Sequence, residues 1–188
     1  MPILGIMASQ ISGHLWAPDG AYDALSTVTV GSGGVASITF SSIPATYKHL
    51  QIRWLARDNF ASDASDVAMR FNSDSGANYS WHQLVGDGST AAAYASTSQT
   101  LMRAGFVAGS TAGSNVFAPT VLDLLDYANT SKNKTVRNLA GYDKNTAGSI
   151  GLQSGSWMNT AAINTISITP RVGTTFSEFS QFSLYGVK

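Results

Sequence analysis

Apolar and polar residues alternate along several stretches of the chain, whereas no stretch repeats apolar residues at the spacing of a helix. The alternating stretches are residues 27–30, 36–41, 50–54, 67–72, 135–142, 165–169 and 179–187, and residues 121–127 form a mostly apolar run. A period of two places every second side chain on the same face of a strand. The pattern therefore predicts roughly eight to ten strands separated by turns.

Two connections carry more specific predictions. Residues 31–34, Gly-Ser-Gly-Gly, lie between two alternating runs, which predicts a β-hairpin because glycine adopts the positive φ angles of tight turns. Residues 87–99 show no clear period, and we expect a short helix around residues 91–95. The strand spacing favours a sandwich over a parallel α/β fold. We predict an all-β chain, with an antiparallel β-sandwich or jelly-roll-like domain over residues 21–188.

Residues 1–20 precede the first clear strand and form an apolar N-terminal arm that closes on the turn signal of residues 17–20. Its large apolar side chains are Ile3, Leu4, Ile6, Met7, Ile11, Leu15 and Trp16. Burying one such side chain contributes roughly 1.5 to 3 kcal/mol, so leaving all of them in water is costly. The arm either folds back over its own sandwich or docks on a neighbouring subunit or larger assembly. We favour docking, and these seven residues are the predicted assembly anchor.

Composition narrows the classes of partner. The chain balances 11 Lys and Arg against 11 Asp and Glu, so it lacks the positive charge with which proteins grip nucleic acid. No apolar run reaches the roughly 20 residues of a membrane helix, and the first residues carry no basic start of a secretory signal. We therefore expect no nucleic-acid partner and no membrane partner. With 25 Ser, 17 Thr and 18 Gly, the surface is rich in hydroxyls, as in β-rich assembly proteins.

The residues that could carry chemistry form no recognisable site. His14, His49 and His82 are too far apart in sequence for a local metal site, and the chain contains no cysteine. No G-x-S-x-G nucleophile motif is present. Asp123 and Asp126 lie three residues apart, so on a regular strand they would face opposite sides. We predict no catalytic residue, no cofactor and no metal ligand, and hence that the chain is not an enzyme.

Two weaker signals remain. Residues 72–76, Asn-Ser-Asp-Ser-Gly, faintly resemble a calcium loop but lack its terminal Glu, so we interpret them as a turn. Trp16, Trp54, Trp81 and Trp157 could stack on sugars, although Trp54 and Trp81 lie on alternating segments where core packing is expected. An exposed aromatic platform would support an alternative hypothesis, in which the chain is a carbohydrate-binding module that recognises host surface glycans.

Several strings of the sequence resemble small virion structural proteins of tailed bacteriophages. They are residues 2–13 (PILGIMASQISG), 27–34 (TVTVGSGG), 38–44 (ITFSSIP), 47–53 (YKHLQIR), 70–72 (RFN), 124–129 (LLDYAN) and 182–186 (FSLYG). The likeness spans nearly the whole chain and contains no catalytic signature.

The resemblance implies a structural component of the virion, assembled in the host cytoplasm, with a β-sandwich fold and a homotrimeric assembly. Two positions on the particle compete, a capsid decoration (cement) protein and a tail fibre or appendage subunit. The partners would be copies of the chain itself and other capsid or tail proteins. In the alternative hypothesis, the same chain is a host-recognition module at the tail that binds carbohydrate.

Overall fold

A computed structural model describes residues 20–188, and this part of the chain is all-β. The strands are β1 (Tyr22–Thr29), β2 (Ile38–Phe40), β3 (His49–Ala56), β4 (Ala64–Phe71), β5 (Tyr79–Gly86), β6 (Ala91–Gln99), β7 (Met102–Ala108), β8 (Ala118–Leu125), β9 (Lys134–Asp143), β10 (Gly148–Trp157), β11 (Ile166–Pro170) and β12 (Gln181–Val187). The predicted fold class is confirmed. Residues 1–19 of the predicted arm, which include its seven anchor residues, lie outside the described residues.

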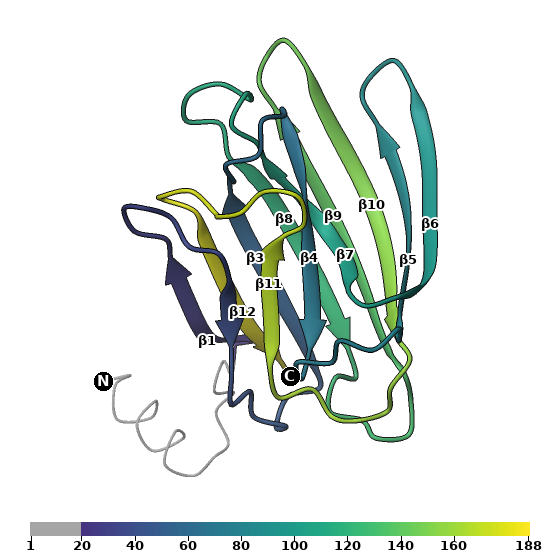
Figure 1. Ribbon diagram of the computed structural model, residues 1–188. Coiled ribbons are helices and arrows are strands. Elements are labelled where there is room, and N and C mark those ends of the chain that lie inside the picture. Colours follow the sequence, from purple (N-terminus) through teal and green to yellow (C-terminus); the bar gives the residue numbers. More distant parts are fainter. Residues whose placement is uncertain (1–19) are drawn as a thin grey trace, which may run out of the picture.

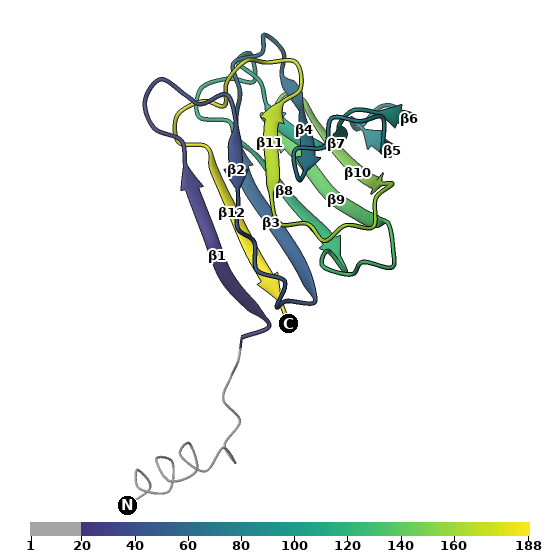
Figure 2. The same cartoon turned by 60° about the horizontal axis from the view of Figure 1, so that its bottom comes forward.

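The strands form two antiparallel sheets that pack face to face (Figure 1). The larger sheet has eight strands in the order β1-β12-β3-β8-β9-β10-β5-β6, and the smaller has four in the order β2-β11-β4-β7. The edge strands of the larger sheet are therefore β1 and β6, at its opposite sides (Figure 2). No helix long and apolar enough to cross a membrane occurs in residues 20–188.

The core between the sheets is built by the alternation that the sequence shows. Along β3, Leu50, Ile52 and Trp54 point inward and are buried, while β12 contributes Phe182 and Leu184 from the neighbouring strand. The smaller sheet supplies the opposing layer, with its buried apolar side chains at Ile38, Phe40, Val67, Met69, Phe71, Ile166 and Ile168. Burial of these inner faces is the main force that holds the two layers together.

The hairpin predicted across residues 31–34 is wrong. A tight turn does form there, with the Gly34 N–H donating to the Gly31 carbonyl and positive φ at Gly33 and Gly34. However, β1 pairs with β12 in the larger sheet, whereas β2 pairs with β11 in the smaller one. The turn therefore carries the chain from one layer to the other, so that the partly buried Val28 packs against the shared core from the larger sheet, and Ile38 and Phe40 are buried in it from the smaller one.

The short helix predicted around residues 91–95 is also wrong, because this segment is strand β6. The turn at Asp87–Thr90 folds it back onto β5, and six successive residues pair with β5 from Ala91 to Ser96. Local alanine propensity favours a helix, but pairing with a preceding strand overrides it. β5 and β6 extend beyond the edge of the smaller sheet, and no residue of β6 is buried (Figure 1).

Candidate assembly surface

A row of large apolar side chains crosses the solvent face of the eight-stranded sheet. Val121 pairs with Leu139, Leu139 with Leu152, and Leu152 with Leu84, so the four side chains lie in line across β8, β9, β10 and β5. They remain 42%, 49%, 58% and 53% exposed, respectively. Ala93 of β6 continues the row beyond Leu84. We call these five residues the apolar row.

The face around the apolar row is hollowed. Ile150 is 58% exposed and borders two hollows. One, of about 580 Å³, is also lined by Pro119 and Leu139, and the smaller, of about 270 Å³, by Leu84 and Leu152. Gly86 and Gly141 pair with Ile150 from either side, so no neighbouring side chain covers it. Contiguous exposed apolar surface of this kind is characteristic of protein–protein contact sites.

A polar border runs along one side of the apolar row. Gln51 donates to Asp123 (Nε2 to Oδ1, 2.8 Å), Arg53 donates to Gln51 (Nε to Oε1, 2.6 Å), and Arg137 lies 3.4 Å from the other oxygen of Asp123. The Arg53 guanidinium also lies over the ring of Tyr185. The arrangement of apolar centre and polar rim matches the anatomy of protein interfaces.

The other face of the same strands carries a row of buried amides. Asn138, Gln153 and Gln83 lie in register across β9, β10 and β5, and Asn138 donates to Gln153 (Nδ2 to Oε1, 3.1 Å). Both side-chain polar atoms of Gln83 and the Gln153 Nε2 are buried without a hydrogen-bond partner within the protein. Unpaired buried amides cost free energy, so this part of the core stabilises the sandwich less than an apolar one would.

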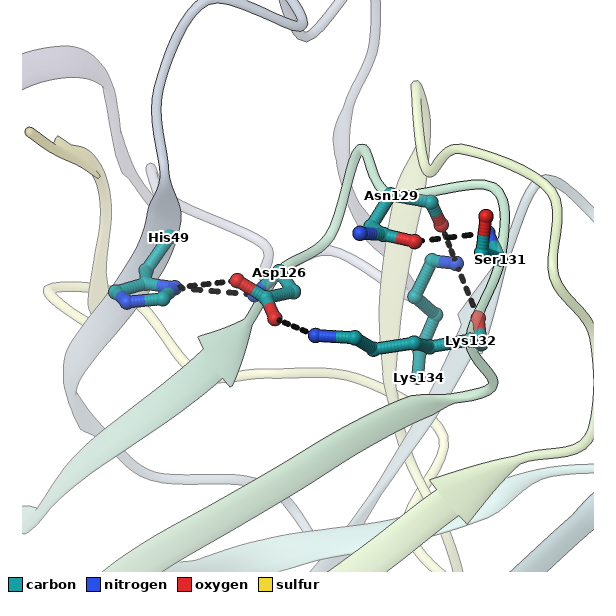
Figure 3. Close-up of polar contacts among 6 residues, drawn as sticks. All are labelled: His49, Asp126, Asn129, Ser131, Lys132 and Lys134. Carbon is teal, nitrogen blue, oxygen red and sulfur yellow. Dashed lines mark hydrogen bonds and ion pairs between the residues drawn. The ribbon is translucent and has the colours of Figure 1, made fainter.

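A second cluster of polar side chains lies at the end of β8, where His49, Asp126 and Lys132 converge (Figure 3). The Asp126 N–H donates to His49 Nδ1 at 3.0 Å, and the Asp126 carboxylate lies 3.6 Å from the same nitrogen. A nitrogen that accepts this backbone hydrogen cannot at the same time donate to the carboxylate. In a catalytic triad that nitrogen must donate, so the pair does not have the orientation of a His–Asp catalytic pair.

The carboxylate of Asp126 is instead held by a lysine. Lys132 donates to it (Nζ to Oδ2, 2.7 Å), and this hydrogen bond, together with the charge of Lys132, lowers the pKa of Asp126. The expectation that Asp123 and Asp126 face opposite sides of one strand does not describe Asp126, because it follows the last residue of β8 and has a positive φ of 48°. The cluster is a loop contact.

Lys134 closes the same loop from below and is fully buried (Figure 3). Its ammonium donates to the carbonyls of Asn129 (2.5 Å), Lys132 (2.9 Å) and Thr160 (3.0 Å). An ammonium group has three N–H donors, so this set of acceptors satisfies it completely. Burial lowers the pKa of Lys134. The residue joins the β8–β9 loop to the segment before β11, which is a structural role.

The structure separates the remaining candidates. Trp54 and Trp81 are buried, as predicted, and Trp157 is buried with them. Residues 72–76 form a turn in which Asp74 accepts hydrogen bonds from the Gly76 N–H and from the Asn78 and Trp157 side chains. Its oxygens therefore serve the fold. His14 and Trp16 lie outside the described residues, and no group of three potential metal ligands occurs within residues 20–188.

A polar cleft of about 610 Å³ opens between the β5–β6 extension and the loop that precedes β4. Its carboxylates are engaged within the protein. Asp63 binds Lys144 (2.6 Å), and Asp66 accepts from Arg103 (Nε to Oδ1, 2.7 Å). Tyr94, 53% exposed, is the aromatic side chain that the cleft presents most openly. In this cleft an exposed aromatic ring lies beside polar groups, the combination that a glycan-binding site needs.

Sequence reasoning missed the apolar row, although its signal is present. Leu84, Leu139 and Leu152 each occupy the outward position of a strand, and one inward neighbour of each is an amide, so burial cannot be assigned from apolar character alone. No protein-family model and no curated protein matches the chain.

Proposed function

We propose that this chain is a non-enzymatic structural protein of a bacteriophage virion, which assembles with copies of itself on the particle. The position is that of a capsid decoration (cement) protein or of a tail fibre or appendage subunit, and the expected oligomer is a trimer. The arm over residues 1–20 anchors the subunit to other virion proteins.

The exposed apolar row is the observation that carries this proposal. Each of its large side chains is still about half exposed, so covering one contributes on the order of 1 kcal/mol, half of the value for complete burial. Four such side chains in line, with Ile150 beside them, favour an assembled state over an isolated subunit. Contacts that exist only in the assembly stabilise the folded chain by mass action.

The polar groups support a structural role rather than catalysis. His49 accepts a backbone hydrogen bond, and the carboxylates of Asp63, Asp66 and Asp74 are held by protein donors. The alternative, a carbohydrate-binding host-recognition module at the tail, draws its support from Tyr94 at the polar cleft. Trp54, Trp81 and Trp157 are buried, so these three do not supply the exposed stacking platform that the alternative expects.

Deletion of residues 2–16 in the phage that encodes the chain tests the proposal. We expect the purified deletion variant to keep the melting temperature of the sandwich, because the deleted residues precede β1, and to be lost from particles. A matched control replaces Ser9, Gln10 and Ser12 with alanine and leaves the apolar anchors in place. Normal incorporation of the deletion variant would contradict the anchor role, and absence of the native chain from purified particles would contradict the proposed function.

A further inference from the structure

Within residues 20–188, the two edges of the eight-stranded sheet are open strands that could pair with another chain. β6 pairs with β5 on one side, and β1 pairs with β12 on one side. Edge strands with unpaired N–H and C=O groups are templates for strand addition, and proteins often protect them with Lys, Pro or inward charges. β6 reads Ala-Ala-Ala-Tyr-Ala-Ser-Thr-Ser-Gln and contains none of these. Its regular pairing ends only at the irregularity near Ser98, which has a positive φ of 54°.

The backbone groups that face outward on β6 follow from the turn before it. The Asp87 N–H donates to the Thr90 carbonyl, so Thr90 belongs to a hydrogen-bonded pair. Such pairs alternate along an antiparallel ladder, which places the bonds of Ala92 and Tyr94 toward β5. The N–H and C=O groups of residues between them, Ala91, Ala93 and Ala95, therefore point away from β5 toward the open side of the edge.

The backbone groups of β1 also alternate between facing β12 and facing outward. The Val30 N–H donates to the Ser180 carbonyl, and the Val30 carbonyl accepts from the Phe179 N–H. Alternation then directs the backbone of Val28 toward β12 and leaves Thr27 and Thr29 with their backbone groups facing outward. β1 is thus open over these two residues, as β6 is open over its alanines.

Ala93 and Thr27 lie at the two ends of one cross-strand line. From Thr27 the pairing runs through Ser183 and Arg53 to Val121, where the apolar row begins, and the row ends at Ala93. All neighbouring strands in this sheet are antiparallel and there are eight of them, so β1 and β6 run in opposite directions. A second copy placed beside the first in the same orientation would therefore continue the antiparallel order.

We propose that copies of this chain assemble by edge-to-edge strand pairing, in which β6 of one copy adds antiparallel to β1 of the next, with Ala93 opposite Thr27. This inference rests on the proposed self-assembly and adds an edge contact to the covering of the apolar row. A head-to-tail contact that closes on itself pairs both edges of every copy, whereas a two-fold β6–β6 contact leaves both β1 strands unpaired. Apart from Tyr94 and Gln99, the side chains of β6 are small, so they leave room for a neighbouring strand at this edge.

Disulfide trapping tests the pairing directly, because the chain has no native cysteine. The double variant Ala93→Cys with Thr27→Cys is compared with each single variant on a non-reducing gel after mild oxidation. Residues that share a hydrogen-bonded antiparallel pair lie about 5.5 Å apart at Cα, which a disulfide can bridge. We expect covalent oligomers from the double variant and monomers from both single variants. Dimers from Ala93→Cys alone would show a two-fold β6–β6 contact and overturn the proposal.

Proline substitution supplies a second, independent measurement. In Ala93→Pro the lost N–H faces outward, so the ladder with β5 stays complete while the edge loses a donor. We expect the dissociation constant of the oligomer to rise about tenfold or more in sedimentation experiments, with Ala93→Thr as the matched control that keeps the N–H. An unchanged oligomer in Ala93→Pro, together with no disulfide in the double variant, overturns the pairing and leaves the proposed function standing. A native chain that stays monomeric at all concentrations overturns both.

Discussion

Replacing Lys134 with methionine removes the charged group that joins two loops at one end of the sandwich. The substitution keeps an unbranched side chain of similar length but abolishes three hydrogen bonds, to the carbonyls of Asn129, Lys132 and Thr160. Hydrogen bonds from a charged donor contribute about 1.5 to 3 kcal/mol each, so the gross loss is about 4.5 to 9 kcal/mol. Removing a buried ammonium recovers several kcal/mol of desolvation cost.

The net expectation for Lys134→Met is a loss of about 3 kcal/mol in the free energy of unfolding, or about 6 to 12 °C in melting temperature for a chain of this size. Urea unfolding followed by fluorescence of the buried tryptophans measures it. Lys132→Met is the matched control, because the Lys132 side chain is 61% exposed and its surface ion pair with Asp126 contributes little. If Lys134→Met unfolds at the same urea concentration as the native chain, Lys134 does not hold the two loops together.

Three further outcomes follow from the same structure. Leu152→Lys should leave the fold intact, because Leu152 is 58% exposed, but should lower incorporation into particles about tenfold or more, since the lysine charge would be covered in the assembly. Quantitative mass spectrometry of purified particles measures this, and full incorporation would show that the apolar row stays uncovered. Burial raises the pKa of the Asp58 carboxyl, so the folded state gains stability from protonation of Asp58 at low pH and loses that stability as the pH rises through the folded-state pKa. Asp58→Asn should therefore raise the melting temperature more at pH 7 than at pH 4, and an equal rise at both would refute the reasoning. Hydrogen bonds from Trp157 and Asn78 lower the pKa of Asp74, so the contribution of Asp74 to the free energy of unfolding is present above about pH 4 and is lost as the pH falls through the folded-state pKa. In Asp74→Asn, the free energy of unfolding, measured by urea titration at several pH values, should fall less steeply on acidification than in the native chain. An equally steep fall would contradict this.

Strand positions could be predicted because burial of one face leaves a period of two in the sequence. Leu50, Ile52 and Trp54 illustrate this, since each inward residue of β3 is apolar and buried. Strand partners could not be predicted in the same way. The residues around Gly33 look like a hairpin locally, but which sheet receives β2 depends on β11, more than a hundred residues further along the chain.

The surface was predictable only in part. The buried state of Trp54 and Trp81 followed from their alternating segments, whereas the exposed state of Leu139 and Leu152 did not, because an outward leucine and an inward leucine look alike in sequence. Their place in one row depends on the register of four strands. The open edge of β6 was hidden for another reason, because its run of alanines favours a helix in isolation.

The proposal that the chain is a virion component is tested most directly by cryo-EM reconstruction of purified particles of the proposed phage. We expect repeated copies of the twelve-stranded sandwich on the capsid or the tail, related by a three-fold axis, with β6 of one copy beside β1 of the next and the apolar row covered. Density at capsid three-fold positions would identify a cement protein, and density on the tail would identify an appendage subunit. Particles that contain no copy of the chain would contradict the account.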